Sequence, residues 1–196
     1  MRLADVPERK SALRSRIRES RGKITPELKE QRDRKLSERT VALISALPHS
    51  RVAAFVPMAS EPGGAHLLPA LADACEELWL PACRPNHQLQ WGRYTGPDSL
   101  QPGAFGILEP VAAAADSAAL ASFDAVIVPA LAIDEAGFRL GQGAGFYDRA
   151  LEKFPGLIAG VVYAEEVLPA GMVPTQPHDI KCSVIMTDKG TIWCAG

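Results

Sequence analysis

The chain has 196 residues, of which 47% are hydrophobic and 22% are charged, and its formal net charge is −2. This length and composition are typical of a single globular domain spanning residues 1–196. The near-neutral charge argues against nucleic acid or a membrane surface as a partner, and no stretch approaches the length of a membrane span.

The average charge hides an asymmetry between the two parts of the chain. Residues 1–40 hold 13 of the 21 Lys and Arg but only 7 of the 23 Asp and Glu, whereas the remaining residues carry a net charge of −8. A basic arm of this kind is either a solvated helical face or part of an anion site. The four cysteines form no CxxC pair and the N-terminus has no apolar signal core, so we expect reduced thiols and a cytoplasmic location.

The first two predicted elements are helices. Over residues 7–22, Leu13 and Ile17 form an apolar stripe. A second helix is predicted from the N-cap Thr25 to about residue 47. The first helix also carries basic side chains four residues apart on an adjacent face: Lys10, Arg14 and Arg18.

Beyond residue 50 the pattern changes to short apolar runs. Strands are predicted at 51–58, 77–83, 88–94, 124–133, 156–163 and 182–188. A helix is expected around 65–77, and 95–123 is expected to form a long loop with a short helix. Continuous apolar strands with helices between them predict an α/β domain with a mostly parallel sheet covered on both faces.

A glycine-rich stretch, RLGQGAGFYDR, spans residues 139–149 and follows the most strand-like run. Alternating glycine packs poorly in a strand, but it allows a sharp turn and a close approach to the backbone N–H groups. Such amides can bind phosphate; Arg139 could grip the same anion, and Asp148 could ligate an accompanying Mg²⁺. The stretch is neither a Walker A loop nor a Rossmann fingerprint, so by itself it equally fits a turn needed only for strand-to-helix packing.

In its wider context, VPALAIDEAGFRLGQGAGFYDRAL resembles the signature of the 5-formyltetrahydrofolate cyclo-ligase family, also called 5,10-methenyltetrahydrofolate synthetases. Other stretches resemble family motifs in the same order: KSALR (10–14), AFVPMASEP (54–62), LWLPACRP (78–85), LQWGRY (89–94), GILEP (106–110) and PTQPHDIKCSVIMTD (174–188). The resemblance therefore extends over almost the whole chain.

The resemblance implies a three-layer α/β/α domain with N-terminal helices and an ATP- and Mg²⁺-dependent enzyme. Its expected reaction converts 5-formyltetrahydrofolate into 5,10-methenyltetrahydrofolate with release of ADP and phosphate. The formyl oxygen would be phosphorylated and the ring would then close. We expect a monomer acting on this small molecule, which can carry a polyglutamate tail.

Site residues are carried over position by position. The resemblance implies nucleotide binding by Lys10, Arg14, Arg139, Gly141, Gln142, Gly143, Ala144, Gly145, Phe146, Tyr147 and Asp148. Tyr147, Arg139 and Lys10 are the expected catalytic groups. Asp148 and Asp179 are the expected Mg²⁺ ligands, and Glu61 and Tyr147 should face the folate. Phe55, Met58 and Trp91 are candidate walls for the pterin by their chemistry, although Trp91 on an alternating strand equally fits a core position.

The sequence departs from the family pattern at several positions. Gln142 replaces a common Arg, Ala144 a Gly or Lys, Phe146 a Tyr, and Glu166 a Gln. Alanine at 144 would cost about 1 kcal/mol or more if that position needs a positive φ. These departures leave open a catalytically weak folate- or nucleotide-binding paralogue. A third possibility is that the basic helices over residues 8–47 dock an acidic partner or nucleic acid.

Overall fold

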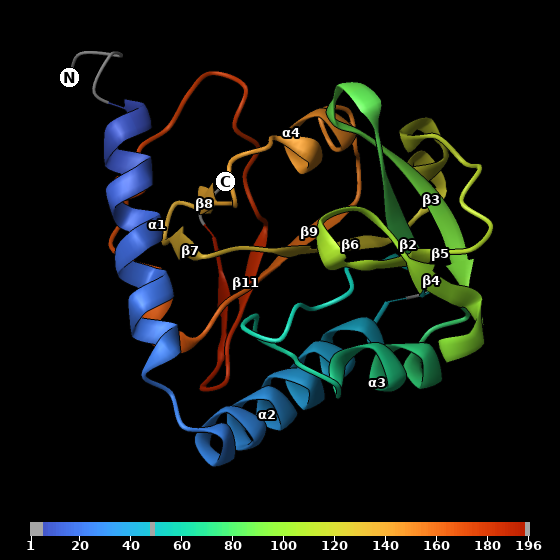
Figure 1. The fold of residues 1–196 in the computed structure, drawn as a ribbon, viewed down its shortest axis with the longest axis horizontal. Helices are drawn as coiled ribbons and strands as arrows, with labels where there is room; N and C mark the ends of the chain where they lie inside the picture. Colours follow the sequence, from blue (N-terminus) through green and yellow to red (C-terminus); the bar gives the residue numbers. More distant parts are fainter. Residues whose placement is uncertain (1–5, 48–49, 195–196) are drawn as a thin grey trace.

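A computed structural model describes residues 6–47 and 50–194. Within these residues, a central sheet of seven strands has the spatial order β12-β11-β9-β6-β1-β2-β3 (Figure 1). The strands are β1 (Arg51–Ala53), β2 (Glu77–Arg84), β3 (Gln88–Tyr94), β6 (Ala125–Pro129), β9 (Leu157–Val161), β11 (Val184–Met186) and β12 (Thr191–Trp193). Neighbours from β2 to β11 pair in parallel, and only the edge strands β3 and β12 run antiparallel. The prediction of a mostly parallel sheet is confirmed.

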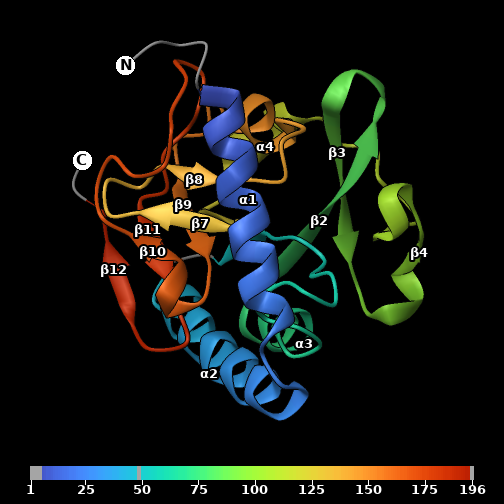
Figure 2. The same ribbon diagram turned by 60° about the vertical axis from the view of Figure 1, so that its left-hand side comes forward.

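Helix α1 (Val6–Gly22) stands beside the central sheet and covers a small sheet with the order β10-β7-β8 (Figure 2). The small sheet is built from β7 (Ala132–Asp134), β8 (Arg139–Leu140) and β10 (Val167–Leu168). Leu13 and Ile17 of α1 pack against Leu131 and Leu140, so the predicted apolar stripe is the docking face of the helix. Although α1 is long, it is highly charged, and no helix among the described residues is long and apolar enough to cross a bilayer.

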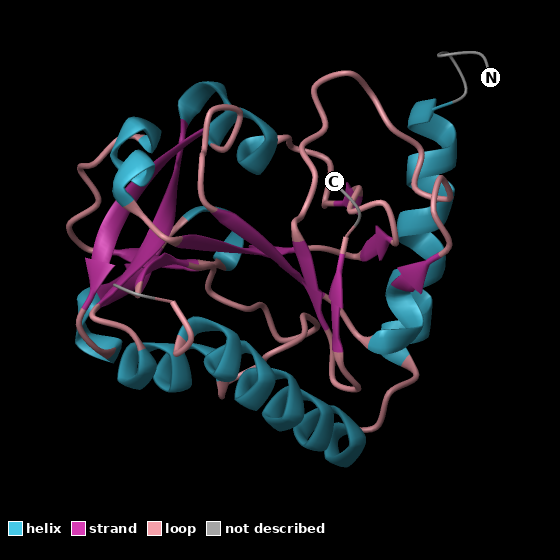
Figure 3. Ribbon diagram, turned by 180° about the vertical axis from the view of Figure 1, so that it is seen from behind, coloured by secondary structure: helices cyan, strands magenta, loops and turns pink. Residues whose placement is uncertain are grey.

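Helices cover both faces of the central sheet (Figure 3). α2 (Pro26–Ile44) and α3 (Leu67–Ala74) pack on one face; the other is covered by a short helix, Ser117–Ser122, and by α4 (Phe146–Ala150). On β6, the Ile127 side chain packs in the core beneath α2 and α3, and the Val126 side chain packs in the core on the opposite face of the sheet. Because both faces of this strand are buried, its sequence is apolar without alternation. The expected three-layer α/β/α fold is confirmed, with one helical layer built from short pieces.

Two predicted strands end earlier than their apolar runs. The run 124–133 is divided, because the Leu131 N–H donates to the Leu140 carbonyl and carries the chain from β6 into the small sheet. The run 51–58 stays in the central sheet only through β1, and its later residues leave the sheet. A buried loop needs the same apolar side chains as a buried strand, so composition does not separate them.

The segment 95–123 contains the predicted short helix and a hairpin that the sequence pattern did not predict. Its strands are β4 (Leu100–Pro102) and β5 (Leu108–Pro110). Three-residue strands show too little alternation to be recognised, and the same holds for β12.

A buried ion pair anchors the C-terminal end of α1. Arg21 donates to both carboxylate oxygens of Glu166, at 2.6 and 2.8 Å, and also to the Ala130 carbonyl at 2.8 Å. Glu166 in turn accepts the Tyr163 N–H at 2.9 Å. The side chains of Arg21 and Glu166 are almost completely buried, so removing either one would leave the other as an unpaired charge in the protein interior.

Glu166→Ala is expected to lower the free energy of unfolding by about 3 to 5 kcal/mol, because it leaves the Arg21 guanidinium buried without a counter-charge. Lys23→Ala is the matched control, since it breaks the exposed Lys23–Glu19 pair and should leave stability nearly unchanged. Urea unfolding followed by tryptophan fluorescence measures both. Equal, small losses in the two variants would show that the buried pair does not stabilise this fold.

Candidate active site

A cavity lies where the loops after β1 and β6 separate. In the central sheet, the next strand in the chain after β1 is its neighbour β2. The next central strand after β6 is β9, which lies on the side of β6 away from β1. Loops that leave adjacent parallel strands in opposite directions open a crevice at the carboxyl ends of those strands. Here the cavity measures about 670 Å³, within the usual range for small-molecule sites.

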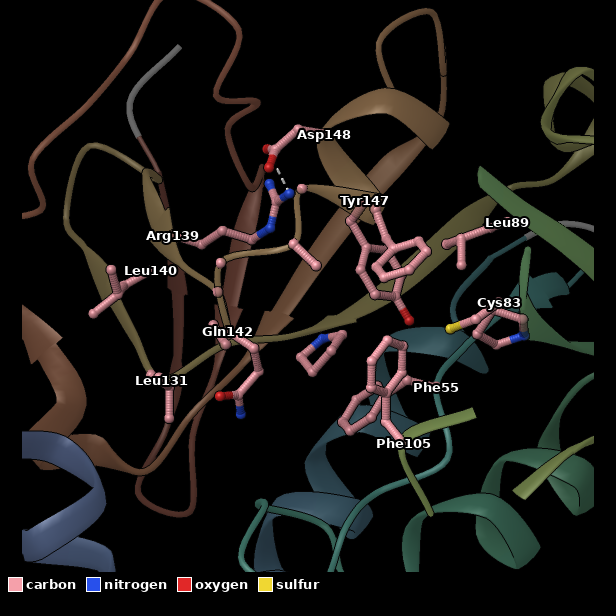
Figure 4. A pocket seen from close by; sticks show the side chains of 18 of the residues that line it. Phe55, Cys83, Leu89, Phe105, Leu131, Arg139, Leu140, Gln142, Tyr147 and Asp148 are labelled. Carbon is pink, nitrogen blue, oxygen red and sulfur yellow. Dashed lines mark hydrogen bonds and ion pairs between the residues drawn. The ribbon is translucent and has the colours of Figure 1, made fainter. Parts of the chain in front are cut away.

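The cavity wall is assembled from segments far apart in the sequence. The main contributors are Lys10 and Arg14 from α1, Phe55, Met58 and Glu61 after β1, Ala130 and Leu131 after β6, Phe105 from the β4–β5 hairpin, the stretch from Arg139 to Asp148, and Asp179. In Figure 4, Leu131, Leu140 and Gln142 lie on one side of the space, Cys83 and Leu89 lie on the other, and the Tyr147 ring stands between them. All predicted site residues except Trp91 line this cavity.

The glycine loop turns at its second and third glycines. Gly143 has φ +113° and Gly145 has φ +71°, a region that L side chains rarely adopt. A Cβ at Gly143 would also lie 3.3 Å from the guanidinium carbon of Arg14, so the Arg14 side chain would have to shift by a few tenths of an ångström. Ala144 is not among the positive-φ residues, so alanine at this position introduces no backbone strain.

The basic face of α1 lies against this loop. Arg14 Nε donates to the Gly141 carbonyl at 2.9 Å, and Lys10 Nζ pairs with Asp179 Oδ2 at 2.7 Å. Burial beside Arg18 lowers the pKa of the Arg14 guanidinium from its ordinary value. Lys10 and Arg14 of the basic stripe therefore form part of the cavity wall, which the charge pattern alone could not distinguish from a solvated face.

Arg139 and Asp148 contact each other. Arg139 is 7% exposed and donates to Asp148 Oδ1 at 2.6 Å and to the Ile180 carbonyl at 3.0 Å. The Ile180 N–H also reaches Asp148 Oδ1, at 3.3 Å. These bonds tie the start of α4 to the segment that carries Asp179.

The two aspartates form a donor set suited to a metal that is bound mainly by its substrate. Both line the cavity, but no group of three His, Cys, Asp or Glu able to hold a metal occurs in the described part of the chain. Mg²⁺ is commonly held by one or two carboxylates together with substrate phosphates. Asp148 and Asp179 fit that mode, and they do not form an all-protein cage.

Glu61 is a buried carboxylate that lines the cavity. Its Oε2 accepts the Met58 N–H at 3.0 Å, and its Oε1 accepts from Gln142 Nε2 at 3.5 Å. Burial raises the pKa of Glu61, although both hydrogen bonds act against that shift. The carboxylate is thus fixed at both oxygens before any ligand arrives.

Aromatic side chains line the cavity, among them Phe55, Phe105 and Tyr147. Tyr147 is partly buried, and its hydroxyl points toward the side where Phe55 and Phe105 lie (Figure 4). Trp91 corrects one expectation, because it is completely buried and does not line the cavity. It packs edge-on behind Tyr147 at 6.5 Å between ring centroids and donates Nε1 to Ser117, so it supports the wall from the core.

Phe105 is a cavity residue that the sequence did not single out. It is 75% exposed, has φ +58°, and meets the Phe146 ring edge-on at 6.3 Å. Glu109 fixes the hairpin beneath it by accepting the N–H groups of Cys83 and Ala104. The sequence predicted a long loop in this region, but it did not indicate which side chain the loop presents to the cavity.

Comparison with known proteins agrees with this geometry. Residues 6–188 match the family model described as the 5-formyltetrahydrofolate cyclo-ligase family. A 5-formyltetrahydrofolate cyclo-ligase of Mycolicibacterium smegmatis is 34% identical over 192 residues, covering 93% of this chain and 95% of the relative. The cyclo-ligase of Escherichia coli K12 is 28% identical over 174 residues, covering 87% and 96%.

Two solved structures share the fold. The NMR structure of Aquifex aeolicus 5,10-methenyltetrahydrofolate synthetase has a TM-score of 0.76 and 31% identity, covering 95% of this chain and 93% of that one. A 5,10-methenyltetrahydrofolate synthetase from Mycoplasma pneumoniae, with a TM-score of 0.67, 17% identity and coverage of 91% and 98%, supports the fold alone. The chain therefore belongs to the 5-formyltetrahydrofolate cyclo-ligase family and is an enzyme of that type.

Proposed function

We propose that this enzyme uses MgATP to convert 5-formyltetrahydrofolate into 5,10-methenyltetrahydrofolate, ADP and phosphate. One observation carries the proposal: the same cavity is lined by the cations Lys10, Arg14 and Arg139 with the glycine loop, which we call its cationic half, and by the buried carboxylate Glu61 with Phe55 and Met58, which we call its folate half. Tyr147 lines the same cavity, and we assign it to the place where the transferred phosphoryl group and the formyl oxygen would meet.

The cationic half suits a triphosphate. Lys10 and Arg14 supply charge from one side, and the N–H groups of the turned glycine loop supply donors from another. Arg139 supports this half through its bond to Asp148. Mg²⁺ held by Asp148, Asp179 and the nucleotide oxygens would supply further neutralisation of the phosphates.

The other half suits a pterin. Glu61 can accept hydrogen bonds from the ring N–H and amino donors, and Phe55 and Met58 offer apolar contact to its faces. Because the Glu61 carboxylate is already fixed by Met58 and Gln142, binding should cost little side-chain ordering.

The chemistry asks the protein mainly for positioning and charge stabilisation. The formyl oxygen attacks the γ-phosphorus and ADP leaves, which turns an unreactive amide oxygen into a phosphate leaving group. Nitrogen 10 then attacks the formyl carbon, phosphate departs with the C–O bond electrons, and the proton of nitrogen 10 is released. A neutral Tyr147 phenol at the junction can donate to the oxygen that gains charge.

Two of the departures that suggested a weak paralogue give no structural reason for a loss of activity. Ala144 adopts no strained backbone, and Glu166 is the buried partner of Arg21 outside the cavity wall. Gln142 does face the cavity, and its partner Arg18 is considered below. These observations favour turnover over binding without turnover.

The first test is an absorbance assay of the methenyl product with 5-formyltetrahydrofolate and MgATP. We expect product that requires both ATP and Mg²⁺, and a loss of about 10²-fold or more in kcat for Asp148→Ala. Asp73→Ala on the exposed surface of α3 is the control and should keep full activity. A flat wild-type trace with tight folate binding would instead identify a binding paralogue.

Lys10→Ala and Arg14→Ala are each expected to raise KM for ATP by about 10-fold or more, because each removes a charge-assisted contact to phosphate. KM for the folate should change little. Arg16→Ala removes the same charge from an exposed position of α1 that does not line the cavity. An equal rise in KM for ATP in Arg16→Ala would show that the basic face acts only through its general electrostatic field.

Tyr147→Phe is expected to lower kcat by about 10²-fold while leaving KM for the folate nearly unchanged, since the ring remains and only the donor is lost. Burial raises the pKa of the Tyr147 phenol well above its ordinary value, so the hydroxyl stays protonated at working pH. The shape of the pH–rate profile should therefore match the wild type between about pH 6 and pH 9. A wild-type alkaline limb in this range that disappears in Tyr147→Phe would contradict this role.

A further inference from the structure

Gln142 lies between a cation of α1 and the buried carboxylate of the folate half. Arg18 Nη2 donates to Gln142 Oε1 at 2.6 Å, and Gln142 Nε2 faces Glu61 Oε1 at 3.5 Å. Lys10 and Arg14 line the cavity, whereas Arg18 is exposed and its contact with the cavity wall runs through Gln142.

The charges at the two ends decide how the amide is oriented. An arginine has only donors, an ionised carboxylate has only acceptors, and the glutamine amide has one end of each kind. With Arg18 bonded to Oε1, the NH₂ group must face Glu61. The bond from Arg18 is charge-assisted and short, so it sets the orientation and the weaker contact to Glu61 follows.

We propose that Arg18 is a positioning residue for the folate half of the site: by orienting Gln142, it holds Glu61 in place to receive the pterin. The inference rests on the proposed function, in which Glu61 contacts the pterin. The Met58 N–H fixes one oxygen of this carboxylate through its own loop, and the relay from α1 fixes the other. If the Gln142 amide were flipped, its Oε1 would face the Glu61 Oε1, and two acceptor oxygens would oppose each other.

A direct phosphate contact by Arg18 is the competing role, and kinetics separate the two. Arg18→Ala is expected to raise KM for 5-formyltetrahydrofolate roughly tenfold, with KM for ATP changed by less than about twofold. Arg18→Lys keeps a charged donor and should restore most of the loss. Arg16→Ala is the matched control. A rise in KM for ATP alone would overturn the proposal.

A double-mutant cycle tests whether Arg18 acts through Gln142. Gln142→Ala should raise KM for the folate at least as much as Arg18→Ala, and combining the two should add nothing further. Fully additive effects would show that Arg18 acts by another route and would contradict the relay.

One readout does not depend on turnover. In the ligand-free protein, the side-chain NH₂ signals of Gln142 in a ¹H–¹⁵N spectrum should move in Arg18→Ala and stay in place in Arg16→Ala. If the wild type binds 5-formyltetrahydrofolate but makes no product, the same variants are compared by Kd from fluorescence quenching. Failure of the proposed function would thus appear as absent product, and failure of this inference as unmoved Gln142 signals or an unchanged folate Kd.

Discussion

Strands β1 and β6 lie side by side and run in the same direction, yet the chain leaves them toward opposite edges of the sheet. The loops that follow these two strands therefore diverge, and neither loop fills the space between them. One loop carries Glu61, and the other forms the wall at Ala130 and Leu131. The glycine loop and α1 complete the remaining sides, so the site depends on this divergence.

Helix α1 contributes both to the stability of the fold and to the wall of the cavity. Its apolar stripe packs on the small sheet, Lys10 and Arg14 line the cavity, and Arg21 near its end is buried against Glu166. Burying this ion pair has a desolvation cost, which its bidentate geometry and the bonds to Ala130 and Tyr163 offset. The same Arg21 bond to Ala130 connects the helix anchor to the cavity wall.

Two positions that depart from the family pattern contact arginines of this helix. Glu166 pairs with Arg21, and Gln142 accepts from Arg18. At the first position an acidic residue meets a buried cation; at the second a neutral amide replaces a side chain whose charge would repel Arg18. Each departure is understandable only together with its partner on α1, more than 120 residues away in sequence.

Periodicity, apolar runs and ordered motifs determined the α/β class, the parallel sheet, the two N-terminal helices and about half of the residues of the cavity wall, because these features depend on local side-chain chemistry. Only the tertiary structure decided that Trp91 supports the wall from the core, that Phe105 lines it, and that Glu166 lies outside it. These outcomes depend on which distant segments pack together. A strand's alternation does not say which neighbour covers each face, and a charge does not reveal its partner.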